Sequence, residues 1–212
     1  TGGLLATLDI IGRAQDWNYG CYLEAVPDSD ILHVAAQWSA AKVLSEDLLD
    51  QAARRVLRPG DSVSGRVLAT GEPLWVDDII DDPLLADPQT VQALGAGSAL
   101  FIPAIAGGLS VGVLCFLGHE QRVHEPAQKA SARGIGQQLG QFLRRKEAEA
   151  ALQASERFSR STLDALAEHI AVLDNHGYIL AVNQAWRDAM AGAGPHALRA
   201  LEGSNYLTHC DR

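Results

Sequence analysis

The feature that most constrains the fold of this sequence is residues 95–118, a charge-free stretch divided by Gly107-Gly108. Side chains of a β-strand point to alternate faces, so a period of two indicates a strand. After the glycines, both alternating sets are apolar: one contains Leu109, Val111, Val113, Cys115 and Leu117, and the other Leu114 and Phe116. This predicts a central strand buried on both faces. Ala99–Ala106 predicts its antiparallel partner, because two glycines supply the positive φ angles of a tight hairpin turn.

A membrane-spanning helix is the alternative for this stretch, because it is long enough to cross a bilayer. Pro103, the glycine pair and the period of two favour strands instead. The opening segment LLATLDII has no basic region before it, so it does not have the pattern of a signal peptide. We therefore expect no membrane insertion within this chain.

Composition narrows the classes of function. The chain is 47% hydrophobic and 20% charged, which is ordinary for a globular protein, and its formal net charge is -9. No stripe of Lys and Arg could neutralise phosphates, so we expect no nucleic-acid partner. Cys21, Cys115 and Cys210 lie far apart without a C-x-x-C pair, which favours a reduced, cytoplasmic setting over disulfides or zinc.

The remaining elements of the first two thirds predict an α+β fold, an antiparallel sheet flanked by helices. We expect a helix over residues 4–16, a hairpin of residues 17–26 and 31–38, a short helix over residues 64–69 closed by Gly71, and a strand over residues 73–76. Another helix begins after Ser45 and stops at Pro59-Gly60. Its predicted buried side is Leu48, Leu49, Ala52, Val56 and Leu57.

Residues 127–158 predict one long helix, because they lack proline and are rich in helix-forming residues. Its first apolar patch is Ile135, Leu139, Phe142 and Leu143. Beyond it, residues 170–174 and 178–182 predict two strands joined by the turn Asn175-His176-Gly177, and Asn183 predicts the start of another helix.

Two families share these motifs. SGRVLATGEPLWVDDI followed by SALFIPAIAGGLSVGVLCFL resembles the core of a GAF domain, with matches at Gly65, Val67, Thr70, Gly71, Pro73, Val76, Asp77, Pro103, Gly112, Val113 and Leu114. The resemblance implies a sensor domain over residues 1–146, without chemistry of its own. RRKEAEAAL, residues 144–152, resembles a signalling helix, and the predicted helical linker is residues 147–162. Residues 163–212 resemble the first half of a PAS domain, through Asp174, Gly177, Ile179, Val182, Asn183 and Ala185.

The GAF resemblance implies a ligand pocket between the sheet and residues 76–95. The candidate lining residues are Trp38, Trp75, Asp77, Phe101 and Phe116, and the alternative is that the aromatic residues belong to the core. We interpret residues 76–95 as a mobile lid with few apolar anchors. Its acidic residues Asp77, Asp78, Asp81 and Asp82 could bind a divalent cation, but a hydrated loop is the favoured interpretation.

Cofactor patterns leave the ligand open. Bilin-binding relatives often carry a Cys-His pair, whereas Cys21 and Cys115 precede Tyr22 and Phe116, so a covalent bilin is not expected. The N-K-x-x-x-F-x-x-x-D-E signature of cyclic-nucleotide-binding relatives is absent, and haem stays an open alternative with His33 or His119. The H-E-x-x-x-H spacing from His119 to His124 does not favour a metal site.

We therefore expect a cytoplasmic sensory module of a bacterial signalling protein, whose output domain is a histidine kinase or a diguanylate cyclase. We expect no catalytic activity, since nucleophile-elbow and kinase motifs are absent. The alternatives are a redox enzyme resembling free methionine sulfoxide reductase, with Cys21 and Cys115, and a ligand-free dimerisation adaptor. A homodimer is expected because apolar positions of the long helix need a partner. The predicted interface residues are Leu8, Leu139, Phe142 and Leu152.

Overall fold

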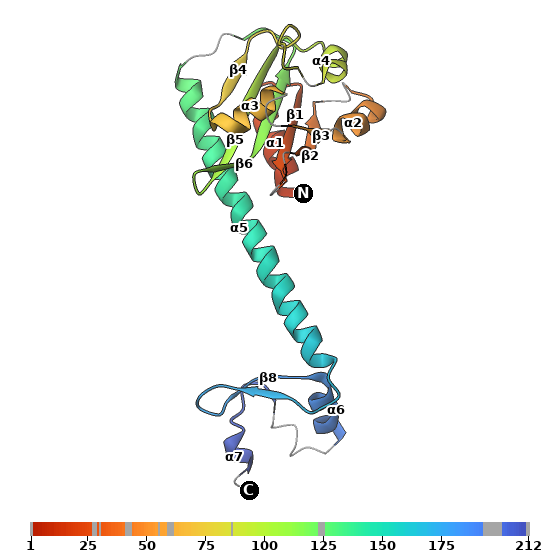
Figure 1. The fold of residues 1–212 in the computed structure, drawn as a ribbon, viewed down its shortest axis with the longest axis vertical. Coiled ribbons are helices and arrows are strands. Elements are labelled where there is room, and N and C mark those ends of the chain that lie inside the picture. Colours follow the sequence, from red (N-terminus) through yellow and green to blue (C-terminus); the bar gives the residue numbers. More distant parts are fainter. Residues whose placement is uncertain are drawn as a thin grey trace. The chain divides into compact units, whose positions relative to one another are not determined.

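The structure is a computed structural model, which describes residues 2–26, 29, 31–40, 44–54, 56–58, 62–85, 87–122, 126–192 and 201–210. The chain forms two compact units, residues 1–145 and 146–212. Figure 1 shows the elements of each unit. Among the described residues, no helix is long and apolar enough to cross a membrane.

The first unit is built on an antiparallel six-stranded sheet of order β3-β2-β1-β6-β5-β4. The strands are β1 Tyr19–Ala25, β2 Leu32–Ser39, β3 Val56–Leu57, β4 Leu74–Val76, β5 Ser98–Ala106 and β6 Leu109–Gly118. The predicted hairpin of β5 and β6 is present, and Gly107 and Gly108 have φ angles of 60° and 81°. Strand β6 lies between β1 and β5, so it is central as predicted.

The end of β6 next to the turn differs from the prediction. Leu109 is 70% exposed, and Val111 packs with the residues of the opposite face from Val113. The pairing shifts here, because Ala104 pairs with Gly112 whereas Ile105 pairs with Ser110. Val111 is therefore the extra residue of a β-bulge, which reverses the alternation of side chains.

Four helices surround the sheet within the first 95 residues: α1 Gly2–Ala14, α2 Glu46–Ala53, α3 Val63–Thr70 and α4 Pro88–Leu94. Helix α3 ends at Gly71 with a φ angle of 66°, as predicted. The prediction that Val56 and Leu57 continue α2 is wrong: they form β3, paired with His33 and Leu32. Pairing with the open edge of β2 satisfies backbone groups that an isolated last helical turn would leave to water. The predicted helix stop, Pro59-Gly60, lies outside the described residues, as does most of the turn predicted at residues 27–30.

The sheet has two different faces. We call the first the cavity face; it packs against α2, α3 and α4 through Tyr19, Cys21, Phe101, Cys115 and Leu117. The second, which we call the helix face, packs against α1 and α5 through Tyr22, Leu100, Ile102, Leu114 and Phe116.

Helix α5, Pro126–Asp164, is longer than predicted, and its first part lies on the helix face. Ala132 and Leu139 are buried there, 2% and 5% exposed. The close approach depends on two glycines: a Cβ at Gly136 would overlap the carbonyl of Pro103, and one at Gly140 the backbone of Ile105. Glycine lowers helix propensity, so these two residues weaken the helix locally but allow its backbone to pack tightly on β5.

The second unit contains the last part of α5, a hairpin of β7 Ala171–Leu173 and β8 Ile179–Val182, and helices α6 Gln184–Gly192 and α7 Leu207–Cys210. Asn183, which is fully buried, caps α6 through Oδ1, which accepts from the N–H of Trp186 at 3.1 Å. Its Nδ2 donates to the carbonyls of Leu163, Leu166 and Glu168. One buried amide thus joins the end of α5 to the hairpin, which explains why this position requires a side chain that both donates and accepts.

Candidate functional site

The cavity face encloses a small apolar cavity of about 80 Å³. Strands β1, β2, β5 and β6 form its floor, and α2, α3, α4 and residues 79–85 and 87 cover it. Its lining residues are Tyr19, Cys21, Leu23, Val34, Ala52, Leu57, Ser62, Val63, Ser64, Ile79, Leu84, Leu85, Asp87, Thr90, Val91, Phe101, Cys115 and Leu117. No Lys or Arg occurs among these described lining residues, so the cavity suits a small uncharged ligand.

The segment that covers the cavity is held by its own hydrogen bonds. The carbonyl oxygen of Leu84 accepts a hydrogen bond from the N–H of Val63 at 3.2 Å. The N–H of Leu84 donates to Asp82 Oδ1 at 2.8 Å. Ser62 caps α3, because its Oγ accepts from the N–H of Gly65 at 3.0 Å. Ile79 is 1% exposed. The interpretation of residues 76–95 as having few apolar anchors is therefore wrong, because Ile79, Val91 and Leu94 are buried in the core, although Ile80 is exposed.

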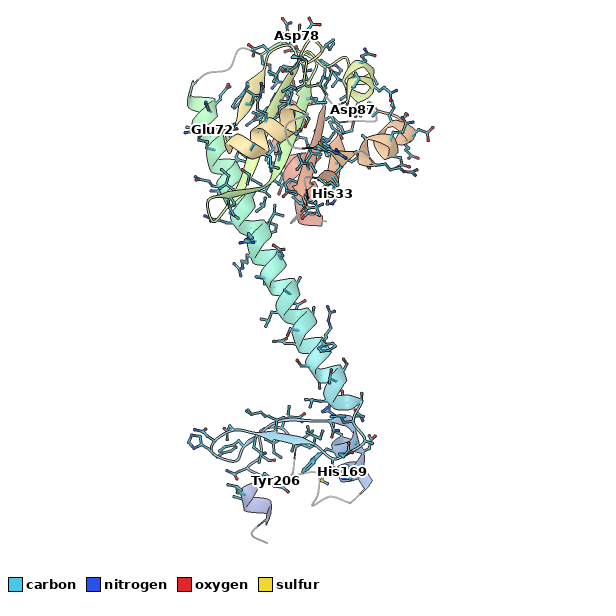
Figure 2. The ribbon with its side chains drawn as sticks, viewed as in Figure 1. His33, Glu72, Asp78, Asp87, His169 and Tyr206 are labelled. Carbon is cyan, nitrogen blue, oxygen red and sulfur yellow. The ribbon has the colours of Figure 1, made fainter. Side chains whose placement is uncertain are left out.

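Among the described lining residues the one carboxylate is Asp87, which immediately precedes helix α4. Asp87 caps α4, since its Oδ1 accepts from the N–H of Thr90 at 3.1 Å, and Figure 2 shows it next to that helix. Pro88 follows at the first helical position, where its fixed φ angle suits the helix. Asp87 therefore has a structural role, and its negative charge also acts on the cavity floor.

The floor carries ionisable groups that stay neutral. The hydrogen bond with the Cys21 thiol, together with burial and the negative charge of Asp87, raises the pKa of the Cys115 thiol well above its usual value. Burial and the neighbouring cysteines raise the pKa of the Tyr19 hydroxyl. That hydroxyl donates to Gln37 Oε1 at 3.3 Å. At neutral pH Cys115 and Tyr19 are therefore uncharged, which matches an apolar occupant.

The structure divides the predicted lining residues between the two faces. Phe101 lines the cavity, whereas Trp38, Trp75 and Phe116 pack on the helix face. Trp38 Nε1 donates to Asp9 Oδ1 on α1 at 2.7 Å. Asp77 is exposed and does not line the cavity. The three aromatic residues on the helix face are core side chains, as the alternative interpretation held.

A second, wider hollow of about 490 Å³ lies on the helix face and includes Trp75. Its one basic residue, Arg122, donates to the backbone carbonyls of Gln15 and Asp16, both at 2.6 Å, and stacks 4.4 Å from the ring centroid of Trp17. Its charge is thus already used to close the turn after α1. We therefore regard the apolar cavity as the candidate site.

The residues present do not fit a haem. Neither His33 nor His119 lines the cavity, and a volume of about 80 Å³ is far below the size of ordinary cofactor sites. His119 is exposed, with its Nδ1 3.3 Å from the carbonyl oxygen of Gly95. Among the described residues, no group of three or more His, Cys, Asp or Glu could hold a metal ion. Asp78 lies at the outer rim of the unit in Figure 2. His124 and Glu125 lie outside the described residues.

The residues predicted for a dimer interface differ in how far their side chains are exposed. Leu8 and Leu139 are 0% and 5% exposed, so they already belong to the core on the helix face. Phe142 and Leu152 are 42% and 61% exposed. A Cβ on Gly3 would lie 3.3 Å from Cζ of Phe142, so that ring covers the first turn of α1. Of the four, Leu152 is the most accessible.

Sequence reasoning missed most of the lining, including Tyr19, Ala52 and Val91. A usable signal was present on β6: Cys115 and Leu117 alternate with Phe116, so the faces of the strand were predictable. The sequence did not predict which face has a cavity, because that depends on the helices that cover each face.

Solved structures with a similar fold belong to several classes of protein. The GAF domain of a phosphoenolpyruvate-protein phosphotransferase from Coxiella burnetii has a TM-score of 0.59 at 17% identity, covering 70% of this chain and 84% of that chain. Free methionine-R-sulfoxide reductase from Neisseria meningitidis, in complex with its substrate, has a TM-score of 0.54 at 19% identity, covering 72% and 80%. A domain of a putative two-component sensor histidine kinase protein from Sinorhizobium meliloti 1021 has a TM-score of 0.53 at 21% identity, covering 72% and 95%.

Sequence comparison adds one curated relative and one family. An uncharacterized 104.1 kDa protein from Rhodobacter capsulatus is 47% identical over 53 residues, which are 24% of this chain. The matched part is 6% of the length of that relative. The family model of the GAF domain matches residues 4–144, which include the whole sheet and the cavity. This chain therefore belongs to the GAF domain family.

Proposed function

We propose that this chain is a sensory module of a bacterial signal-transduction protein, in which a small uncharged ligand binds in the apolar cavity. The observation that carries the proposal is the partly open, apolar cavity between the sheet and three helices. Family membership supports it, as does the similar fold of the sensor histidine kinase domain from Sinorhizobium meliloti. Its role is regulatory rather than catalytic, and its setting is the cytoplasm.

Xenon tests the cavity directly, because closed apolar cavities bind xenon or benzene. We expect the xenon NMR signal to shift with increasing protein concentration. Ala52→Leu places a larger side chain in the cavity and should abolish that dependence, while Ala148→Leu, on an exposed part of α5, is the control. An identical xenon response in wild type and Ala52→Leu would remove the basis for ligand binding.

Ligand binding should be visible in the covering segment. Ile79, Leu84 and Val91 line the cavity, so an occupant contacts the covering segment as well as the floor. Strand β6 is already paired on both sides, so we expect xenon to slow amide hydrogen exchange in residues 79–85 and 87–94 more than in β6. If both regions respond equally, the segment does not report on the cavity.

Helix α5 then carries the change to an output domain that is a histidine kinase or a diguanylate cyclase. The second unit is the first half of a PAS domain, as its D-x-x-G and V-N-x-A patterns suggest. The capping by Asn183 and the turn held by Asp174, whose Oδ1 accepts from the N–H groups of His176 and Tyr178, support this proposal. Exchange of this unit for a complete PAS domain in a kinase fusion should keep the regulation if the assignment is right.

The module acts as a homodimer through the exposed apolar side chains of α5, Leu152 and Phe158, which are 61% and 73% exposed. Leu152→Glu places a charge at that position and should raise the dissociation constant of the dimer about tenfold or more. Tenfold corresponds to a loss of about 1.4 kcal/mol of association free energy. Gln153→Glu adds the same charge one residue away and is the matched control. Sedimentation at several concentrations decides: a wild-type chain that stays monomeric well above micromolar excludes this dimer.

A redox enzyme resembling free methionine sulfoxide reductase is the second candidate, because Cys21 and Cys115 lie together on the cavity floor and the fold is shared. The raised pKa of the Cys115 thiol and the lack of a basic residue in the described lining argue against it, since a zwitterionic substrate needs charged partners. Turnover of free methionine sulfoxide with a thiol reductant, lost in Cys21→Ser or Cys115→Ser, would establish it. A dimerisation adaptor without a ligand remains if xenon does not bind and the dimer forms.

A further inference from the structure

Two cysteines from distant parts of the sequence are direct neighbours across the centre of the sheet. Cys21 on β1 and Cys115 on β6 are paired in the antiparallel register, and both side chains line the cavity. They are 6% and 7% exposed, and both are free thiols. Tyr19 and Leu117 form the adjacent pair on the same face. The two thiols therefore share one side of the sheet and one small apolar space.

The pairing brings the two residues into disulfide range. Residues directly opposite in an antiparallel pair have Cα atoms about 4.5 or 5.5 Å apart, depending on their hydrogen bonding, and disulfides span about 4.4–6.8 Å. The Cα spacing of either arrangement therefore lies within the disulfide range, and the Cβ atoms, about 4.5–5.5 Å apart in such pairs, must approach slightly to reach the roughly 3.5–4.5 Å of a disulfide. We propose that Cys21 and Cys115 are an oxidation site, at which a small hydroperoxide converts the two thiols into a reversible cross-strand disulfide. This inference is independent of which ligand the cavity takes.

The chemistry balances in two steps. One sulfur, as the thiolate, attacks a peroxide oxygen; the O–O bond breaks, a sulfenic acid forms and the hydroperoxide leaves as water or an alcohol. The second sulfur then attacks the sulfenic sulfur, the S–S bond forms and the hydroxyl group leaves as water. The two cysteines together lose two protons and two electrons, and the peroxide gains them. A small dithiol reverses the reaction by thiol–disulfide exchange.

The surroundings of the pair set its reactivity. A cavity of about 80 Å³ next to the sulfurs has room for hydrogen peroxide, whose size is close to that of one or two waters. Only the thiolate attacks, and the hydrogen bond with Cys21, burial and Asp87 keep the pKa of the Cys115 thiol high. The other titratable groups facing the pair are Tyr19 on β1 and Asp87 at the start of α4. Oxidation is therefore slow at neutral pH, so the pair responds to sustained rather than brief exposure.

The test uses the whole chain with Cys210→Ser, which leaves only this pair of thiols. The folded protein is exposed to hydrogen peroxide, then unfolded and treated with N-ethylmaleimide. We expect the intact mass to fall by two hydrogen atoms, both maleimide adducts to disappear, and a peptide that links Cys21 to Cys115. Dithiothreitol should restore both adducts. The oxidation rate should rise by about tenfold per pH unit in the alkaline range, as thiolate forms.

Single variants separate pair formation from general reactivity. In Cys21→Ser or Cys115→Ser, the remaining thiol should stay free or form only a sulfenic acid, without the loss of two hydrogens. The proposal is wrong if N-ethylmaleimide still labels both cysteines of the folded chain after prolonged peroxide treatment at alkaline pH, while the chain unfolded in urea oxidises. Irreversible sulfonic acid at either position also overturns it. The result does not depend on folding of the variants, because the linked peptide is measured in the chain that retains both cysteines, and xenon binding tests the ligand proposal separately.

Discussion

The two faces of the central sheet are covered by helices in opposite ways. On the helix face, α1 and the first part of α5 contact the sheet closely, because Gly136 and Gly140 let the backbone of α5 approach β5. On the cavity face, three short helices and residues 79–85 and 87 meet over the floor and leave a cavity of about 80 Å³. The helix face also has free space, because the hollow of about 490 Å³ lies there beside α5. The difference is that close backbone contact at Gly136 and Gly140 fixes α5 on one face, whereas several short helices cover a small apolar cavity on the other.

The largest expected effect comes from the glycines that bring α5 onto the helix face. Gly140→Ala forces a Cβ into the backbone of Ile105 and should lower the free energy of unfolding by about 3 kcal/mol, near the upper range for overpacking. Gly134→Ala is the matched control, since a Cβ there meets no atom within 4 Å. It should stabilise the helix by up to about 1 kcal/mol. Urea unfolding measures both, and equal effects of the two substitutions would contradict the close packing.

A pair of identical substitutions compares the faces themselves. Ala104 is fully buried on the helix face, whereas Ala52 lines the cavity. Ala104→Leu should cost about 1–3 kcal/mol, because a well-packed core has no space for the added carbons. Ala52→Leu fills existing space, so its unfolding free energy should stay within about 1 kcal/mol of wild type. A larger loss for Ala52→Leu than for Ala104→Leu would mean that the cavity is not free space.

Alkaline pH should destabilise the cavity face selectively. The pKa values of Cys115 and Tyr19 are raised in the folded protein, so the folded state keeps protons that the unfolded chain releases. Stability from these groups is complete below the unfolded cysteine pKa of about 8.5 and is lost as pH rises above it. Each group should cost at most about 1.4 kcal/mol per pH unit. Denaturant titrations from pH 7 to about 10.5 measure the slope. Cys115→Ser should remove the part of the pH dependence that begins at about pH 8.5. An unchanged slope in that variant would mean that Cys115 is not the group responsible.

The smallest effect is expected for the charges that join the segment after α3 to α5. Glu72 forms an ion pair with Arg133 and lies 3.9 Å from Lys129, and Figure 2 labels it next to α5. These side chains are about half exposed, so solvent screens them. Glu72→Gln should lower the thermal midpoint only slightly, and the difference should vanish in 1 M salt, where the Debye length is about 3 Å. A large loss at low salt that vanishes in 1 M salt would mean that charge, rather than glycine packing, holds α5.

Much of the fold was predictable because local patterns agree with the final structure. The alternation in β5 and β6, the glycine turn, the Gly71 helix end and the long helix α5 all follow from residues close together in the sequence. The errors occur where a residue responds to a distant partner. Val56 and Leu57 have an apolar helical spacing after α2, yet they pair with the edge of β2. Val111 is displaced by a bulge that the sequence of β6 alone does not reveal.

The candidate site illustrates the same division. The sequence by itself determined the antiparallel sheet, the alternating faces of β6 beyond its bulge and membership of the GAF domain family, since these depend on periodicity and short motifs. Only the tertiary structure decided that Trp38, Trp75 and Phe116 pack on the helix face, that Leu8 and Leu139 are core residues, and that Cys21 and Cys115 lie opposite each other. The physical reason is that side-chain periodicity defines two faces but not what covers them. Strand register and helix docking decide that, through contacts between residues far apart in the chain.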